Sequence, residues 1–599
     1  MDEENDKKDT VIDFISGIEV NAGPEEVKAV QVFSKKLVRD YSYEKDQIQT
    51  HPQFRVKASP SGQDKYPVDI VIFRSNKKDY DNVYMVIECK QPNRKDGRRQ
   101  LDIYLNLVPS VEIGIWYNGK DHLYLRKVIE NGRIAWQEIP DIPKKNERIQ
   151  DIGYYKRKDL IKPDDLKTIF DDIRNHLVGN TTGITRDEAI ASEIINILFC
   201  KLYDELICEQ DDQVNFRAGV DEKKAEIKKR IEKIFENVKK DYDDVFDNDE
   251  HIKLDDDSIV YIVGQLQKYC IINADRDAIG DAFEVFIGPA LRGGEGQFFT
   301  PRNVVKMMVE MIDPNPGEYI IDPACGSGGF LIIALEHVWK KIEDEGKRKK
   351  WSDSTIISKK KDVASRFFSG IDKDSFLAKV TKSYMAIVGD GRGGVFCENT
   401  LVPQSEWQGK SKDRVELSKF DVLLTNPPFG IKIPVKGEAT LAQYDLGYKW
   451  QFDKKTIIWK KTSKLTDKRP PQVLFIERCI QLLKPGGRMA IVLPDSIVGN
   501  QTDGYVRDYI LSKTKLLGVI DCPPETFQPG TSTKTSVLLL EKKRESDSKD
   551  YKIFMAVADK CGHDRRGKPI IKMNDEGKTI PDDDLPDIIE EYKRFREVY

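Results

Sequence analysis

Four consecutive residues, Asn426-Pro427-Pro428-Phe429, combine an amide, two prolines and an aromatic ring directly after the apolar run 420–425. That run is short and rich in branched side chains, so it predicts a buried strand that the prolines end in a rigid loop. The Asn426 side-chain oxygen and the Pro427 carbonyl could accept both protons of an exocyclic amine, and Phe429 could stack on the ring that carries it. A base would have to leave the duplex to reach such a pocket. The alternative for these four residues alone is a proline-stiffened turn after a core strand.

A glycine-rich turn lies upstream, between the predicted strand 318–322 and a predicted helix that starts at Phe330. Its sequence is Pro323-Ala324-Cys325-Gly326-Ser327-Gly328-Gly329. Such a turn lets a ligand approach the backbone and leaves N–H groups of the helix free. The spacing matches neither GxGxxG nor GxxxxGK, so phosphate binding is less favoured. Asp322, at the end of the strand, suits a ligand with an ammonium group, such as the methionine part of S-adenosylmethionine.

Two further stretches are expected to complete a donor site. A predicted strand over 367–372 ends in Asp372, and a carboxylate at that place is typical for holding ribose hydroxyls. A polar-aromatic loop precedes a predicted helix upstream of the turn: Gln297-Phe298-Phe299-Thr300-Pro301-Arg302. A lone glycine turn is also ordinary strand-to-helix punctuation, so the interpretation depends on these elements together.

The first part of the chain carries a different set of chemical groups. Glu88 and Lys90 are two residues apart in the strand-like run 83–90, so they share one face of the strand. Asp69 lies at the start of the neighbouring strand-like run 68–73. This set suits phosphodiester hydrolysis, because the carboxylates can hold Mg2+ and the lysine can orient or activate water. The alternative is a same-face charge pair on an edge strand.

Composition narrows the class of protein. The 599 residues are 39% hydrophobic and 33% charged, which predicts a globular chain of roughly three to five domains. No apolar run approaches the ~20 residues of a membrane span, and the acidic N-terminus does not resemble a signal peptide. Nine cysteines without a CxxC pair argue against zinc sites and disulfides, and favour a cytoplasmic location. The net charge of −4 means that any DNA contact must come from local patches or a partner.

The pattern of elements predicts a multidomain α/β protein. We expect a small α/β domain over 1–160, a helical connector over 161–280, a doubly wound Rossmann-like domain over 281–545, and a charged tail over 546–599. The tail is expected to dock on a partner, and the alternative is that it packs as terminal helices.

A long polar insertion over 431–471 places Tyr444, Tyr448, Trp450 and Trp459 among lysines. Aromatic and basic groups together suit nucleic acid, but a solvated loop with its own packing cluster is an equal alternative. The basic run 347–350 is more often a solvated surface than a DNA track.

The second half of the chain resembles the adenine-specific DNA methyltransferases of type I modification subunits. The matching stretches, in chain order, are 297–302, 322–329, Asp372 and 426–429. The donor stretch precedes the catalytic one, as in the gamma class, and the similarity continues through 483–494. The resemblance implies direct transfer of a methyl group from S-adenosylmethionine to the exocyclic amine of a flipped adenine. Cytosine C5 methylation would need a cysteine nucleophile, and none lies between 421 and 431.

Asp69, Glu88 and Lys90 resemble the core of the PD-(D/E)xK nuclease superfamily. The whole segment is similar to the N-terminal nuclease domain of type I restriction subunits. This resemblance implies DNA cleavage with Mg2+ held by Asp69 and Glu88. A decayed nuclease that only binds DNA is a middle interpretation, against which the complete set of three residues argues.

Other residues support the same resemblance. Gln100 and Tyr104, spaced i, i+4 on a predicted helix, match a further element of that nuclease branch. Glu25, or its neighbour Glu26, matches the early helix glutamate of the family. The basic stretch 94–99 is available to phosphates. The segment 161–280 resembles the helical N-terminal domain of type I modification subunits.

Together these features resemble the catalytic subunit of a type IIB restriction-modification enzyme. About sixty residues follow the predicted catalytic core, too few for a target-recognition domain of the usual size. We therefore expect double-stranded DNA and a separate specificity subunit as partners in a hetero-oligomer. No GxxxxGK[ST] loop occurs, so an ATP-driven motor is not expected from this chain.

Two alternatives stay open. One is a modification-only subunit of a type I-like system, whose first domain is a non-catalytic module that binds DNA or a partner. The other is a non-catalytic scaffold that senses S-adenosylmethionine, against which the intact residues 426–429 argue.

Overall fold

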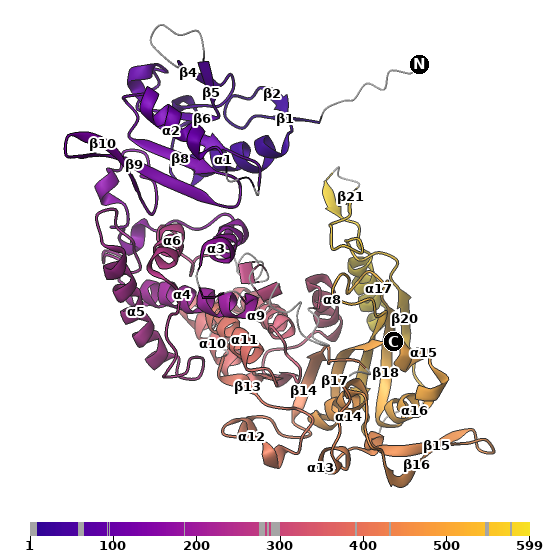
Figure 1. Ribbon diagram of the computed structural model, residues 1–599. Coiled ribbons are helices and arrows are strands. Elements are labelled where there is room, and N and C mark those ends of the chain that lie inside the picture. The colour runs from indigo at the N-terminus through magenta and orange to yellow at the C-terminus, as the bar shows by residue number, and fades with distance from the viewer. Residues whose placement is uncertain are drawn as a thin grey trace, which may run out of the picture. The chain divides into compact units, whose positions relative to one another are not determined.

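The chain divides into two compact units in this computed structural model (Figure 1). Unit 1 comprises Met1–Asp241 and Asn248–Phe286, and unit 2 comprises Tyr242–Asp247 and Ile287–Tyr599. The structure describes residues 9–57, 65–92, 94, 96–181, 183–184, 186–274, 282–283, 285, 287–288, 300–389, 392–430, 433–545, 550–574 and 578–599. None of the helices in these described ranges has the length and apolar character that a membrane crossing requires.

Unit 1 begins with a six-stranded sheet in the order β10-β9-β8-β7-β6-β3. Its strands are β3 (Ile48–Gln49), β6 (Ile70–Phe73), β7 (Val83–Cys89), β8 (Ile113–Tyr117), β9 (His122–Glu130) and β10 (Arg133–Glu138). β7 and β8 are parallel, and the other pairs are antiparallel. Two-stranded sheets accompany it: β1 (Thr10–Ile12) with β2 (Glu19–Asn21), and β4 (Phe54–Lys57) with β5 (Lys65–Val68).

One helix covers each face of this sheet. Phe33 of α1 (Gln31–Arg39) lies 4.9 Å from Tyr117 of β8, centroid to centroid, in a core cluster that includes Ile87. Leu101 of α2 (Arg98–Leu107) belongs to a second cluster, on the opposite face, that includes Val86. Successive residues of a strand point to opposite faces. Glu88 therefore lies on the same face as Val86, toward α2.

A helical layer follows within the same unit. Its helices are α3 (Leu166–Asn180), α4 (Asp187–Ile207), α5 (Lys224–Asp241) and α6 (Asp256–Leu266). Lys268, which follows α6, donates to Tyr41 Oη at 2.5 Å and pairs with Asp141 at 3.1 Å, and all three side chains are buried. A buried charge is stable only when it is paired and hydrogen-bonded. This network therefore ties the helical layer to the α/β segment.

Unit 2 is built on an eight-stranded sheet in the order β13-β12-β11-β14-β17-β19-β18-β20. The strands are β11 (Ile320–Asp322), β12 (Phe368–Asp372), β13 (Val395–Cys397), β14 (Phe420–Thr425), β17 (Leu483–Pro494), β18 (Thr514–Asp521), β19 (Thr535–Lys542) and β20 (Phe554–Val557). Only β19 runs antiparallel to its neighbours within this sheet. The prediction of a doubly wound α/β sheet is confirmed.

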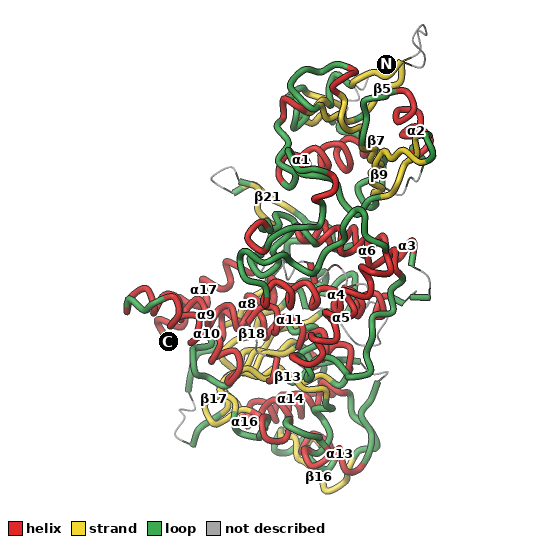
Figure 2. Tube along the Cα trace, turned by 90° about the vertical axis from the view of Figure 1, so that its left-hand side faces the viewer, coloured by secondary structure: helices red, strands yellow, loops and turns green. Residues whose placement is uncertain are grey.

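Helices cover both faces of this sheet (Figure 2). α14 (Pro471–Leu482) and α16 (Gly504–Lys513) contribute to the buried core on one face. α8 (Arg302–Ile312), α9 (Gly329–Lys349) and α17 (Leu585–Val598) form a second group that packs on the sheet. α10 (Asp353–Phe367) and α11 (Ser375–Gly389) lie against β12.

The direction in which strands are added reverses at β11. The chain passes from β11 to β12 and β13 on one side, and then returns to β14 on the other side. In open α/β sheets a ligand binds outside the carboxyl ends of the strands at such a reversal. Asp322, Asp372 and Thr425 end three of these strands, so the predicted motifs meet at one edge.

The tail packs on its own unit. β20 extends the sheet through its pairing with β18, and Phe554 of β20 contacts Tyr592 of α17. Docking of the tail on a partner stays a prediction.

Candidate functional site

A pocket lies at the carboxyl ends of β11, β12 and β14 in unit 2. Predicted residues in its wall are Thr300, Pro323, Ala324, Gly326, Ser327, Gly329, Asp372, Asn426, Pro427, Pro428 and Phe429. Pro301 and Arg302 begin α8, while Asp322 and Gly328 support the wall. Gln297, Phe298 and Phe299 lie outside the described residues. The fold thus gathers stretches that are more than a hundred residues apart in the chain.

Asn426 presents a free acceptor in this pocket. Its Nδ2 donates to Thr300 Oγ1 at 3.0 Å, whereas its Oδ1 is buried without a hydrogen-bond partner among the described residues. An unsatisfied buried acceptor costs about 1–3 kcal/mol, which a ligand donor would recover. Phe429 also lines the pocket and is 6% exposed. The pair offers an amine acceptor and a stacking ring.

Asp322 carries a second free acceptor. Oδ1 accepts from Thr425 Oγ1 at 2.7 Å and from the Ala324 amide at 3.0 Å, but the buried Oδ2 has no partner among the residues described. Burial raises the pKa of this carboxyl to about 7. A cationic ligand group would stabilise the ionised form.

Asp372 braces the glycine-rich turn. Its Oδ2 accepts from the Gly326 amide at 2.9 Å, and its Oδ1 accepts from the Asp374 amide at the same distance. Burial raises the pKa of this carboxyl as well. The link joins the end of β12 to the turn after β11.

Gly328 is required by the path of the turn. Its φ is +87°, and a Cβ at this position would lie 2.9 Å from Thr381 Cγ2. Thr381 in turn donates to the Gly326 carbonyl at 2.6 Å. A larger residue at Gly328 would displace α11 or the turn.

The pocket also contains residues that sequence reasoning missed. They include Glu398, Asn399, Thr400 and Leu401, which follow β13. Thr400 Oγ1 donates to the Pro323 carbonyl at 2.6 Å and so joins this loop to the donor turn. The signal was the one used for Asp372: polar residues directly after a short apolar run.

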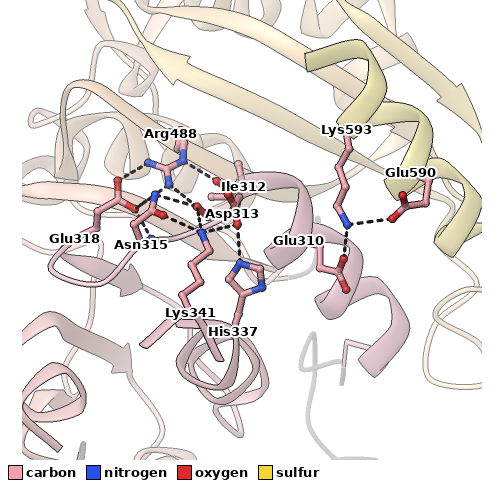
Figure 3. Close-up of polar contacts among 10 residues, drawn as sticks. All are labelled: Glu310, Ile312, Asp313, Asn315, Glu318, His337, Lys341, Arg488, Glu590 and Lys593. Atoms are coloured by element: carbon pink, nitrogen blue, oxygen red, sulfur yellow. Dashed lines mark hydrogen bonds and ion pairs between the residues drawn. The ribbon is translucent and has the colours of Figure 1, made fainter. Parts of the chain in front are cut away.

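The far end of α8 is held by a cluster of charged groups (Figure 3). Arg488 of β17 pairs with Glu318 at 2.7 Å and donates to the carbonyls of Ile312 and Asp313 at 2.7 and 2.9 Å. The Asp313 carboxylate lies 2.7 Å from His337 Nε2 of α9. These contacts satisfy carbonyl groups that a helix end leaves open.

The tail holds α8 at two more points. Lys593 of α17 pairs with Glu310 at 3.0 Å (Figure 3). Asn303 Nδ2 donates to Asp583 at 2.9 Å. Because Asn303 lies three residues after Thr300, these contacts support the hydroxyl that orients Asn426.

Unit 1 brings its predicted residues together in a second place. Asp69 Oδ2 accepts from the Cys89 amide at 2.8 Å, and its Oδ1 accepts from Gln53 at 3.1 Å. Glu88 is 1% exposed; its Oε1 pairs with Lys90, and its Oε2 has no partner among the described residues. The buried free oxygen could ligate a cation.

Both carboxyl groups of this cluster resist ionisation. Burial raises the pKa of Glu88 to about 8, and the charge of Asp69 adds to it. Burial raises the pKa of Asp69 to about 6, although the Cys89 amide and Lys90 oppose the shift. A divalent cation would offset the repulsion between the Asp69 and Glu88 carboxylates, so these residues fit Mg2+.

The supporting residues lie around the same cluster. Gln100 donates to Tyr104 Oη at 2.7 Å, and Tyr104 donates to the Pro67 carbonyl at 2.5 Å. The charge of Glu25 contributes to the raised pKa of both Asp69 and Glu88. Glu26 is hydrogen-bonded by Gln31. The charge of Glu26 raises the pKa of Asp69 as well, so either glutamate stays a candidate for this cluster.

Asp13, Glu26 and His51 also lie close enough to share a cation. However, Asp13 already accepts hydrogen bonds from Ser16, Gln31 and Thr50 at 2.6–2.7 Å. We interpret this group as a structural hub.

Two family models match different parts of the chain. Residues 274–598, more than half of the chain, match the family model described as N-6 DNA methylase. The chain belongs to this family. Residues 24–143 match a second model, described as the N terminus of the type I restriction enzyme R protein.

Individual relatives share little sequence identity with the chain. The chain is 28% identical over 272 residues to the type I restriction enzyme EcoEI methylase subunit of Escherichia coli, covering 45% of this chain and 47% of that protein. It is 24% identical over 261 residues to the type II restriction enzyme and methyltransferase RM.BcgI of Heyndrickxia coagulans, covering 43% and 33%. The matched region thus spans half or less of these relatives. A solved structure from work on the type I R-M system aligns with a TM-score of 0.45 and 18% identity, covering 69% of this chain and 82% of that one.

Proposed function

We propose that this chain is the catalytic subunit of a restriction-modification enzyme that methylates the exocyclic amine of adenine in DNA. The observation that carries the proposal is the buried Asn426 Oδ1, which has no partner among the described residues and belongs to the pocket wall beside Pro427. Membership of the N-6 DNA methylase family supports the same chemistry.

Asn426 and Pro427 bind the amine in this proposal. The Asn426 Oδ1 and the Pro427 carbonyl accept its two protons, which directs the nitrogen lone pair toward the donor. Thr300 Oγ1 keeps the Asn426 amide turned so that its oxygen faces the pocket. Phe429 stacks on the base after it has left the duplex.

Asp322 and the glycine-rich turn bind the donor. S-adenosylmethionine, when bound, supplies an electrophilic methyl group. The free Asp322 Oδ2 pairs with the ammonium group of its methionine part, and Asp372 or Glu398 accepts from the ribose hydroxyls. Holding both reactants in line lowers the entropic part of the barrier.

Unit 1 is proposed to cleave DNA that lacks the methyl mark. Asp69 and Glu88 would hold Mg2+, which as a Lewis acid lowers the pKa of a bound water. Lys90 would orient that water, and Gln100 and Tyr104 would support the cluster. The match of residues 24–143 to the restriction-subunit model supports this assignment.

A separate specificity subunit is proposed as partner, together with double-stranded DNA. Similarity to a type I restriction enzyme methylase subunit supports this part of the proposal.

The test uses the chain purified with the product of its neighbouring gene, unmethylated DNA, Mg2+ and S-adenosylmethionine. Asn426→Ala should lose methylation by about 100-fold or more and retain donor binding by calorimetry. Glu88→Ala should abolish discrete fragments. Glu112→Ala, at a half-buried glutamate of the same unit that pairs with Arg74, should cut normally. Methylation without cutting by the wild type would leave the modification-only alternative. Unchanged methylation in Asn426→Ala would refute the assignment of the pocket.

A further inference from the structure

The polar insertion after the catalytic loop folds as a hairpin tethered to the pocket. The hairpin consists of β15 (Tyr448–Asp453) and β16 (Ile458–Leu465), which pair in antiparallel orientation. Ile433 and Val435 before it and Pro471 after it all line the pocket. Both ends of the insertion are therefore part of the pocket wall.

Buried contacts fix the base of this hairpin. Glu477 of α14 accepts from the Asp445 and Leu446 amides at 2.8 Å each. Arg469 donates to the carbonyls of Leu446 and Tyr448 at 2.7 and 2.6 Å. The hairpin base is thus held relative to the pocket.

Two aromatic residues of the hairpin, Trp450 and Trp459, anchor it to α16. The rings of Trp450 and Trp459 lie 6.0 and 5.8 Å from that of Tyr505, centroid to centroid. A Cβ on Gly504 would come within 2.6 Å of Trp459 Nε1, so the glycine permits this close approach. The rings are used for packing, which leaves them poorly placed to stack on bases.

The lysines of the hairpin remain on its surface. Residues 448–465 contain six lysines and one aspartate, although the whole chain has a net charge of −4. Lys460 and Lys461 pair with Asp453 and Asp445. The other four are exposed and make no ion pair with any residue in the described ranges: Lys449, Lys454, Lys455 and Lys464.

We propose that this hairpin binds the phosphate backbone of duplex DNA beside the pocket, through those four lysines. Lysine acts on phosphates as a point charge and carries no sequence information, which suits a subunit whose target is chosen elsewhere. The inference rests on the proposed function, because it requires DNA to present a base to the Asn426 pocket.

The experiment compares the full chain with a variant in which Lys449, Lys454, Lys455 and Lys464 are changed to Gln. Binding to a long duplex of random sequence is measured over a series of salt concentrations. Each lost phosphate contact lowers the magnitude of the slope of log K against log salt by about 0.9. We expect a decrease of about 2–3 and weaker binding at low salt. The matched control changes the exposed run Lys347, Arg348, Lys349 and Lys350 to Gln.

Donor binding should match the wild type in both variants. The hairpin variant should also unfold at the wild-type temperature, since its four lysines are exposed and make no ion pair in the described ranges. The control additionally loses the pairs Lys347–Asp344 and Lys349–Glu345. An unaltered slope in the hairpin variant, or an equal change in both variants, would overturn the inference. If the hairpin variant binds DNA like the wild type but no longer co-purifies with the specificity subunit, the hairpin contacts that protein instead of DNA. Methylation of unmethylated DNA by the wild-type chain in complex with its specificity subunit separates an overturned inference from failure of the proposed function.

Discussion

Two buried oxygen atoms in unit 2, Asn426 Oδ1 and Asp322 Oδ2, have no hydrogen-bond partner among the described residues. Folding leaves such groups unsatisfied only at a cost of about 1–3 kcal/mol each. Both atoms lie where a ligand of complementary chemistry is proposed, an amine for one and an ammonium group for the other. At the scale of the residue, both atoms are thus available to accept a hydrogen bond from a ligand.

The raised pKa of Asp322 predicts that donor binding depends on pH. The carboxyl group is half-protonated near pH 7 in the ligand-free chain. Below that pH it loses the charge that attracts the ammonium group. We expect donor affinity to fall by up to about tenfold per pH unit below this value. Calorimetric titrations with S-adenosylmethionine from about pH 5.5 to about pH 8.5 measure this dependence.

Asp322→Asn provides the control. It should bind the donor weakly at every pH and lack the part of the pH dependence that belongs to this carboxyl. Because the pKa of this carboxyl in the folded chain lies above its ordinary value of 3.8, ionisation destabilises the fold as pH rises from 3.8 toward 7. The ligand-free variant should therefore unfold at a higher temperature than the wild type at neutral pH. A wild-type affinity that is constant across this range would contradict the role of Asp322.

α8 is the element on which the orientation of Asn426 depends. Its first turn follows Thr300, and its last turn is held by the Arg488 cluster. A helix end that lacks such partners leaves carbonyl groups exposed and frays. Contacts at one end of α8 thus contribute to geometry at the other.

Arg488→Met should lower the free energy of unfolding of unit 2 by about 2–3 kcal/mol, because charged hydrogen bonds to Glu318 and to two carbonyls are lost. The Glu318 carboxyl has a pKa below its usual value, although burial opposes that shift. The part of the stability loss that comes from the Glu318 ion pair should be present at neutral pH and disappear in acid. Urea denaturation measures this loss. The transition of unit 2 is identified as the one that S-adenosylmethionine shifts to higher urea concentration. Arg594→Met, at an exposed i, i+3 pair with Glu591, should change stability by less than about 0.5 kcal/mol.

Each proposed active site lies wholly within one compact unit of the molecule. The Asn426 pocket draws on unit 2, and the Glu88 cluster draws on unit 1. Because the two sites share no residues, a substitution can remove methylation or cleavage without altering the residues of the other site.

The whole molecule is expected to bind the donor without its partner but to methylate specific sites only with it. The pocket residues all come from this chain, whereas target choice is assigned to a separate subunit. Calorimetry with the chain alone should give the same donor affinity as the complex, within about twofold. Site-specific methylation by the chain alone would refute the need for a specificity subunit.

Local patterns were enough to predict much of the fold and the site. Residues 420–429 read as a strand ended by prolines, and β14 ends at Thr425. The turn after Asp322 and the carboxylate at Asp372 were predicted by the same reasoning. These predictions rest on neighbours in the chain, whose backbone preferences do not need the rest of the molecule.

Only the tertiary structure decided which of these groups face one another. It placed Thr300 against Asn426, although 126 residues separate them in the chain. It also turned Trp450 and Trp459 of the β15–β16 hairpin toward Tyr505 and left lysines on the surface, where the sequence had left two interpretations equal. The physical reason is that burial and hydrogen-bond satisfaction depend on partners brought from distant positions, and local sequence does not name those partners.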